Sequence, residues 1–170
     1  MVNGDFSQPI VANTSYFIGT PLSIPGWYCS DRCQIDNCTY RILQHVNQKR
    51  PFPDCTGQVL DIDAIGNIQN VSQTIDLGFG YYNLSFDYFW PFSNSYKKTF
   101  LVYFNDKLIF TYRPQLYTMI DTFNFSMIVI GKDSTNQLTF TETKDSYKTK
   151  DQVGFRITNV SLKLITSFWL

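Results

Sequence analysis

The chain has 170 residues, and 14 basic side chains balance 14 acidic ones, so it carries no net charge at neutral pH. Charged residues make up only 16% of the sequence and aromatic residues 17%, and a chain of that composition buries enough apolar surface to offset the entropy lost on folding. These values exclude a disordered chain and argue against a nucleic-acid-binding protein, which needs a basic excess to neutralise phosphates. The length suits one domain spanning residues 1–170.

The first ten residues lack the basic start and the apolar middle of a signal peptide. No stretch of the sequence approaches the roughly 18 consecutive apolar residues of a transmembrane helix. We therefore expect no membrane span, and if the protein is secreted, we expect this sequence to be its processed form.

Residues 21–56 contain four prolines and all four cysteines, a composition that predicts a long irregular loop. Gaps of three, four and sixteen residues separate the cysteines, which are Cys29, Cys33, Cys38 and Cys55. This spacing lacks the paired Cys-x-x-Cys knuckles of a structural zinc site, and the chain has one histidine, His45. We therefore predict disulfides that staple the loop, with the pairing left open.

From about residue 57 onward, apolar and polar side chains alternate, which is typical of strands with one buried face. The clearest run is residues 82–88, where the even positions are apolar. Similar runs at residues 100–104 and 108–112 flank Asn105-Asp106, a pair that predicts a tight hairpin turn. We expect the even positions of all three runs to face the core.

Two further alternating runs, residues 123–127 and 138–140, are separated by the turn-forming sequence GKDS. In the last strand, the apolar residues lie at odd positions up to Ile157 and at even positions from Val160 to Leu164. A β-bulge near Thr158-Asn159 would let both halves face the core. Several short strands separated by turns, without a long helical period, predict an all-β fold, an antiparallel β-sandwich.

Six Asn-x-Ser/Thr sequons are potential N-glycosylation sites. They begin at Asn13, Asn37, Asn70, Asn83, Asn124 and Asn159. Together with the clustered cysteines, they favour an oxidising, extracellular location, either secreted or on the cell surface.

Several short motifs occur along the chain in the order and at the spacing that are typical of a known protein superfamily. They are VNGDF at residues 2–6 with IPGW at 24–27, GQVLDI at 57–62 with VSQTI at 71–75, YNLSFDY at 82–88, and VGFRITNVSL at 153–162. Together they resemble the galactose-binding-domain-like superfamily of carbohydrate-binding modules, over nearly the whole chain. The resemblance implies a jelly-roll β-sandwich that binds glycans, usually in secreted or surface proteins and usually without catalysis.

Many members of this superfamily hold a structural calcium ion with an acidic side chain shortly after the opening motif and another in the last strand. The corresponding positions here are Ser7 and Thr158, which carry no carboxylate. Calcium takes about six to eight oxygen ligands, generally including carboxylates, so this departure weakens the site. The acidic residues left to contribute to a calcium site are Asp5, Asp61 and Asp151.

A sugar presents an apolar C–H face and a rim of hydroxyls, so its site needs exposed aromatic rings beside amide, carboxylate or arginine groups. Because we expect strand aromatics to face the core, we place the site in loops. Two loop clusters combine rings with polar groups: residues 90–96, where Pro91 breaks the preceding strand, and residues 112–117. The candidate carbohydrate-binding residues are Trp90, Phe92, Asn94, Tyr96, Tyr112, Arg113, Gln115 and Tyr117.

Each of these candidates also has a structural interpretation. In that interpretation, Trp90 caps the sandwich core and Arg113 pairs with a carboxylate that holds its loop. In the resembling superfamily the residue matching Trp27 is commonly packed inside, so we expect Trp27 in the core. We expect His45 to be a structural residue of the cysteine-containing loop.

The sequence lacks GxSxG, HExxH and glycine-rich phosphate-loop motifs, and a serine triad would depend on His45 alone. We therefore expect a noncatalytic glycan-binding protein and no enzyme. The alternative is a structural protein whose copies associate as a homo-oligomer into an extracellular coat or filament. Zero net charge, the aromatic content and the apolar residues 167–170 favour that alternative.

Overall fold

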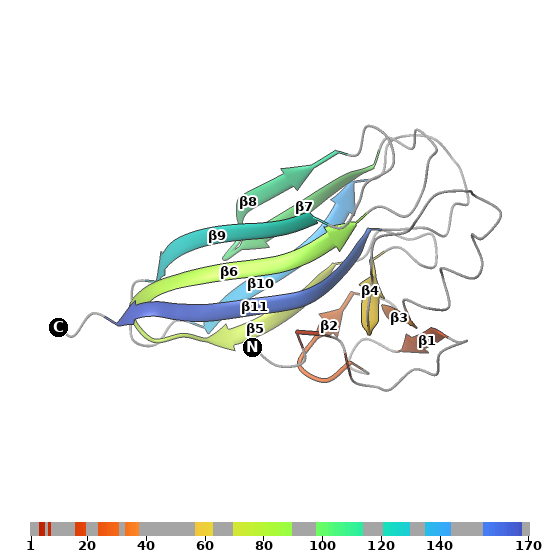
Figure 1. Ribbon diagram of the computed structural model, residues 1–170, viewed down its shortest axis with the longest axis horizontal. Coiled ribbons are helices and arrows are strands. Elements are labelled where there is room, and N and C mark those ends of the chain that lie inside the picture. The colour runs from red at the N-terminus through yellow and green to blue at the C-terminus, as the bar shows by residue number, and fades with distance from the viewer. Residues whose placement is uncertain are drawn as a thin grey trace.

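A computed structural model of the chain (Figure 1) describes residues 4–5, 7, 16–19, 24–30, 33–37, 57–62, 70–89, 98–113, 121–129, 135–143 and 155–167. Within these residues the strands form two antiparallel sheets, one of six strands and one of five. The two sheets pack face to face as a β-sandwich, so the predicted all-β class is confirmed. None of the described residues forms a helix with the length and apolar character needed to cross a membrane.

The six-stranded sheet has the order β1-β3-β4-β11-β6-β9. Its strands are β1 (Tyr16–Gly19), β3 (Cys33–Asn37), β4 (Gln58–Asp61), β11 (Arg156–Ser167), β6 (Gly80–Phe89) and β9 (Asp121–Val129). In Figure 1, β9, β6 and β11 run side by side across the front of the view.

The five-stranded sheet has the order β2-β5-β10-β7-β8. Its strands are β2 (Tyr28–Cys29), β5 (Val71–Asp76), β10 (Thr135–Thr143), β7 (Thr99–Phe104) and β8 (Lys107–Tyr112). Because β5 pairs with β2 and β10, and β10 also pairs with β7, segments far apart in sequence become neighbours in this sheet.

The core between the sheets is built from the faces that the alternation predicts. Phe86 of β6 is fully buried, and its ring meets rings from both sheets. These rings belong to Tyr88, Phe100, Phe110, Phe123 and Phe140. Trp27 is also buried and lies 5.9 Å, centroid to centroid, from Phe140, so its expected core position is confirmed.

The hairpin between β7 and β8 turns at Asn105 and Asp106, as predicted. Both residues have positive φ angles, 49° and 60°, which is the conformation that a two-residue type I′ turn requires. The Asn105 amide oxygen accepts a hydrogen bond from the Gln137 N–H at 2.8 Å, and its Nδ2 donates to Asn136 Oδ1 at 2.8 Å. These bonds attach the turn to β10.

The predicted bulge in β11 is confirmed by a register shift between Thr158 and Ser161, where Asn159 has a φ of 51°. Val160 is buried after the shift, but Leu164 is 52% exposed, so its expected core position is wrong. The ladder between β11 and β6 shifts register again directly after Leu164.

The expected core position of Leu108 is also wrong. The β7–β8 ladder shifts between Val102 and Tyr103, so that Val102 pairs with Phe110 whereas Tyr103 pairs with Leu108. The extra residue, Ile109, reverses the alternation and turns Leu108 outward, where it is 47% exposed.

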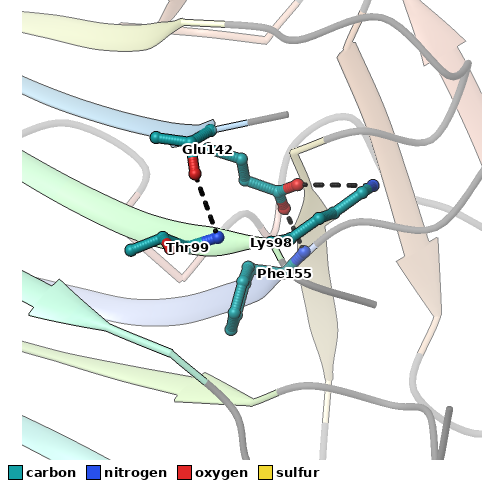
Figure 2. A network of polar contacts seen from close by, with 5 residues as sticks. Lys98, Thr99, Glu142 and Phe155 are labelled. Atoms are coloured by element: carbon teal, nitrogen blue, oxygen red, sulfur yellow. Dashed lines mark hydrogen bonds and ion pairs between the residues drawn. The ribbon is translucent and has the colours of Figure 1, made fainter. Parts of the chain in front are cut away.

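Two ion pairs are buried in the described part of the sandwich. Figure 2 shows the Glu142 carboxylate of β10 between the Lys98 ammonium group, at 3.5 Å, and the Phe155 N–H, which donates to it. Phe155 directly precedes β11, so this carboxylate joins the two sheets. The second pair joins Arg156 Nη2 of β11 to Asp61 Oδ2 of β4 at 3.3 Å.

The disulfide pattern stays a prediction. Cys29 is fully buried and is not a free thiol. The side chains of Cys33, Cys38 and Cys55 lie outside the described residues, as does most of the loop at 21–56.

Candidate functional site

A hollow of about 330 Å³ opens on the outer face of the five-stranded sheet. It is lined by Asn70, Tyr103, Asp106, Thr139 and Thr141. These side chains come from the residue before β5, from β7, from the β7–β8 turn and from β10.

Strand alternation places the lining on one face. Val102, Leu138 and Phe140 are fully buried between the sheets, so their neighbours Tyr103, Thr139 and Thr141 point outward. Tyr103 and Thr139 are directly paired across β7 and β10.

The two remaining lining residues are held by local hydrogen bonds. Asn70 exchanges two bonds with Ser30: its N–H donates to Ser30 Oγ at 2.9 Å, and its carbonyl accepts from the Ser30 N–H at 2.9 Å. Asp106 occupies the type I′ turn that Asn105 attaches to β10. The rim of the hollow is therefore built on regular strands and a clamped turn, which position side chains more accurately than a free loop.

The lining combines the groups that a sugar site requires. Tyr103 offers a ring face and a hydroxyl, the threonines offer hydroxyls that donate and accept, Asn70 offers an amide, and Asp106 offers a carboxylate. A pocket with an aromatic surface and a few convergent polar groups is typical of small-molecule binding sites.

Two of the lining residues, Tyr103 and Thr139, belong to a row of paired residues that crosses the sheet. Opposite one another on successive strands are Tyr28, Ser72, Thr139, Tyr103 and Leu108. Tyr28 is 50% exposed at one end of the row. With three strand spacings of about 4.8 Å each, it lies about 14 Å from the backbone position of Tyr103.

The loop residues predicted from sequence are placed only in part. Trp90, Phe92, Asn94, Tyr96, Gln115 and Tyr117 lie outside the described residues. Tyr112 faces the core side of β8, with its ring 5.1 Å from that of Tyr88 and 6.0 Å from that of Phe155. Arg113 is exposed at the end of β8. Neither of these two residues lines the hollow.

The residues proposed for calcium do not fit such a site where they are described. Asp61 is buried against the Arg156 guanidinium, whose positive charge opposes a cation at the same carboxylate. Asp5 is exposed, and its Oδ1 accepts the Ser7 N–H at 3.2 Å. The Thr158 hydroxyl donates to the Gln58 carbonyl at 2.9 Å. Among the described residues no group of three or more His, Cys, Asp or Glu side chains is placed to hold a metal, and Asp151 lies outside them.

Three sequon asparagines, Asn83, Asn124 and Asn159, share the outer face of the six-stranded sheet. Asn159 Nδ2 donates to Asp87 Oδ2 at 2.7 Å. Asn70 lies at the hollow, Asn37 in β3, and Asn13 outside the described residues. Their glycosylation stays a prediction.

No family model and no curated protein matches the chain. The structure is similar to a cyclase from Fischerella sp. TAU, with 15% identity, a TM-score of 0.57 and coverage of 95% of this chain and 94% of that one. It also matches a family 35 carbohydrate-binding module from Clostridium thermocellum, with 8% identity, a TM-score of 0.48 and coverage of 87% and 97%. A family 4 carbohydrate-binding module matches with 16% identity, a TM-score of 0.46 and coverage of 95% and 97%.

The match to the cyclase shows a shared fold, and the resemblance to the galactose-binding-domain-like superfamily stays a prediction from the sequence motifs. At such identities the likeness concerns the fold, and one fold supports several functions.

The hollow does not follow from the sequence patterns, because strand alternation was expected to turn all strand aromatics toward the core. Phe100 and Val102 face inward on β7, so the same alternation turns Tyr103 outward. That signal identifies an outward aromatic residue but not its neighbours, since Thr139 and Asn70 join it only through strand pairing.

Proposed function

We propose that this protein binds carbohydrate noncovalently on the outer face of the five-stranded sheet. The observation that carries the proposal is the hollow, in which an aromatic ring lies beside hydroxyl, amide and carboxylate groups. A sugar ring stacks its C–H face on Tyr103, while Thr139, Thr141 and Asn70 exchange hydrogen bonds with its hydroxyls.

The composition of the hollow favours binding over catalysis. A glycosidase typically needs two carboxyl groups on either side of the scissile bond, whereas the described lining holds one, from Asp106. The cyclase that shares the fold does not change this assignment, because its likeness is one of fold alone.

The row that ends at Tyr28 supports a ligand longer than one sugar. Tyr28 and Tyr103 are two outward rings on one row, with the partly exposed Thr139 and the buried Ser72 between them. A linear oligosaccharide lying across the strands contacts both rings at once, so affinity rises with chain length until both are covered.

Replacing Tyr103 with alanine is expected to weaken glycan binding at least tenfold, because the stacking surface is lost; central aromatic residues commonly contribute 2 kcal/mol or more, on the order of a thirtyfold effect. A glycan array identifies the ligand, and isothermal titration of its monosaccharide and oligosaccharide forms measures the change.

The matched control is Tyr81→Ala, which removes a half-exposed tyrosine of β6 in the other sheet and is expected to bind like the wild type. A folded wild-type protein that binds no glycan would rule out the proposed function. Unchanged affinity in Tyr103→Ala would place any binding site elsewhere.

We also propose the secreted or surface location, the disulfide-stapled loop and the single domain as expected from sequence. Buried, non-free Cys29 supports the disulfides, and the exposed sequon residues Asn124 and Asn159 are accessible for glycosylation in the folded protein, whereas the proposed sugar site requires Asn70 to be unmodified. Peptide mapping of non-reduced protein from a secreting host checks both modifications.

Self-association is the second candidate function. Leu164 and Ile165 are adjacent on β11 and each 52% exposed, at a register shift in the ladder with β6 that leaves Ile165 unpaired. If copies associate there, Leu164→Ser with Ile165→Ser is expected to convert an assembly to a monomer in size-exclusion chromatography with light scattering. Leu108→Ser, on the other sheet, serves as the control. A wild type that stays monomeric at high concentration contradicts this candidate.

A further inference from the structure

The hollow has an acidic character that the proposed function does not by itself require. Its described lining contains the carboxylate of Asp106 and no lysine, arginine or histidine. The exposed Lys107 follows Asp106 in sequence, but it pairs with Phe104 on the alternate side of the strand from Tyr103.

The position of this carboxylate is set by the backbone. Asp106 has a φ of 60° in a two-residue turn, and three hydrogen bonds from Asn105 attach that turn to Asn136 and Gln137. The Asn136 partner is itself buried. The backbone that carries this exposed carboxylate is therefore held at the rim of the hollow.

A carboxylate at the rim of a binding site discriminates among sugars by charge. It accepts hydrogen bonds from two neighbouring hydroxyls of a neutral sugar, and it attracts the ammonium group of an amino sugar more strongly. It repels a carboxylate, sulfate or phosphate group brought close to it, and repulsion of this kind is a common source of specificity.

We propose that the hollow selects neutral and amino sugars and rejects acidic ones, with Asp106 as the residue that determines this selectivity. The inference rests on the proposed function, because it concerns the ligand class of the same site. It predicts the order hexosamine, then neutral hexose, then hexuronate in affinity.

The test uses an array that carries glucose, glucosamine and glucuronate on one linker, with the corresponding galactose and mannose series, followed by titration. The wild type is expected to bind the hexuronate at least tenfold more weakly than the matching hexose. Asp106→Asn is expected to reduce that difference below threefold and to abolish the preference for hexosamine. Asparagine tolerates a positive φ, so this variant keeps the turn.

Salt provides a second readout, since screening weakens the interaction between charged groups. Raising the ionic strength from about 0.05 M to 0.5 M is expected to reduce the hexosamine preference of the wild type and to leave Asp106→Asn unchanged. Asp76→Asn is the control, because Asp76 is exposed at the end of β5 and does not line the hollow.

The outcomes separate the two proposals. If the folded wild type binds none of the three sugar classes, glycan binding is wrong and the charge selectivity falls with it. If it binds all three classes alike, or prefers hexuronates, only the selectivity is wrong. Discrimination that persists in Asp106→Asn would show that another group is responsible.

Discussion

Replacing Asp61 with alanine is expected to lower the free energy of unfolding by about 3–5 kcal/mol, because the substitution removes the carboxylate from a buried guanidinium. The Arg156 side chain is 2% exposed and that of Asp61 is fully buried, with 3.3 Å between Nη2 and Oδ2. A domain of this kind is stable by only about 5–15 kcal/mol, so the loss is a large part of its stability. Urea unfolding followed by circular dichroism measures it.

The double variant Asp61→Leu with Arg156→Met distinguishes loss of a charge partner from loss of volume. Replacing both charges with apolar groups of similar size is often neutral or stabilising, so the double variant is expected to be more stable than Asp61→Ala. The control Asp76→Ala removes an exposed carboxylate and is expected to change stability by less than about 0.5 kcal/mol. An Asp61→Ala protein as stable as this control would show that the ion pair does not stabilise the fold.

Truncation of Phe86 to alanine is expected to cost about 3–5 kcal/mol of unfolding free energy. Phe86 is fully buried at the centre of the sandwich, with its ring centroid 4.9 Å from Phe123 of the same sheet and 5.1 Å from Phe140 of the other. Its removal leaves a cavity that both sheets line, and such cavities collapse only in part.

Tyr81→Ala is the matched comparison, because it removes an aromatic ring from the outward side of the same strand, β6. Its expected cost is below about 1 kcal/mol. Equal costs for the two variants would contradict the assignment of Phe86 to the centre of the core. Tyr103→Ala measured alongside them checks that the binding variant is folded.

Local patterns predicted the fold well where one residue type dictates the backbone. Asn105 and Asp106 tolerate positive φ, so the hairpin turn was evident from two residues. The change of phase between Ile157 and Val160 located the bulge in β11, because both residues are apolar and must face the same core.

The expected core positions of Leu108 and Leu164 were wrong, because nothing in their own segments shows where the alternation is interrupted. Leu108 turns outward because Ile109 is an extra residue in the ladder, and an apolar run of this kind does not reveal which residue is unpaired. Leu164 pairs with the buried Tyr82, but the ladder shifts register again directly after it, and Leu164 is half exposed.

The sequence by itself determined the all-β class, the inward face of β6, the turn at Asn105-Asp106 and the need for a bulge, because each depends on neighbouring residues in one segment. Only the tertiary structure decided the order of the strands. That order brings Asn70, Tyr103 and Thr139 to one hollow, and it pairs Asp61 with Arg156, which is 95 residues away. Strand neighbours are joined by backbone hydrogen bonds, which all residue types except proline form alike, so a single sequence carries little record of which strands will meet.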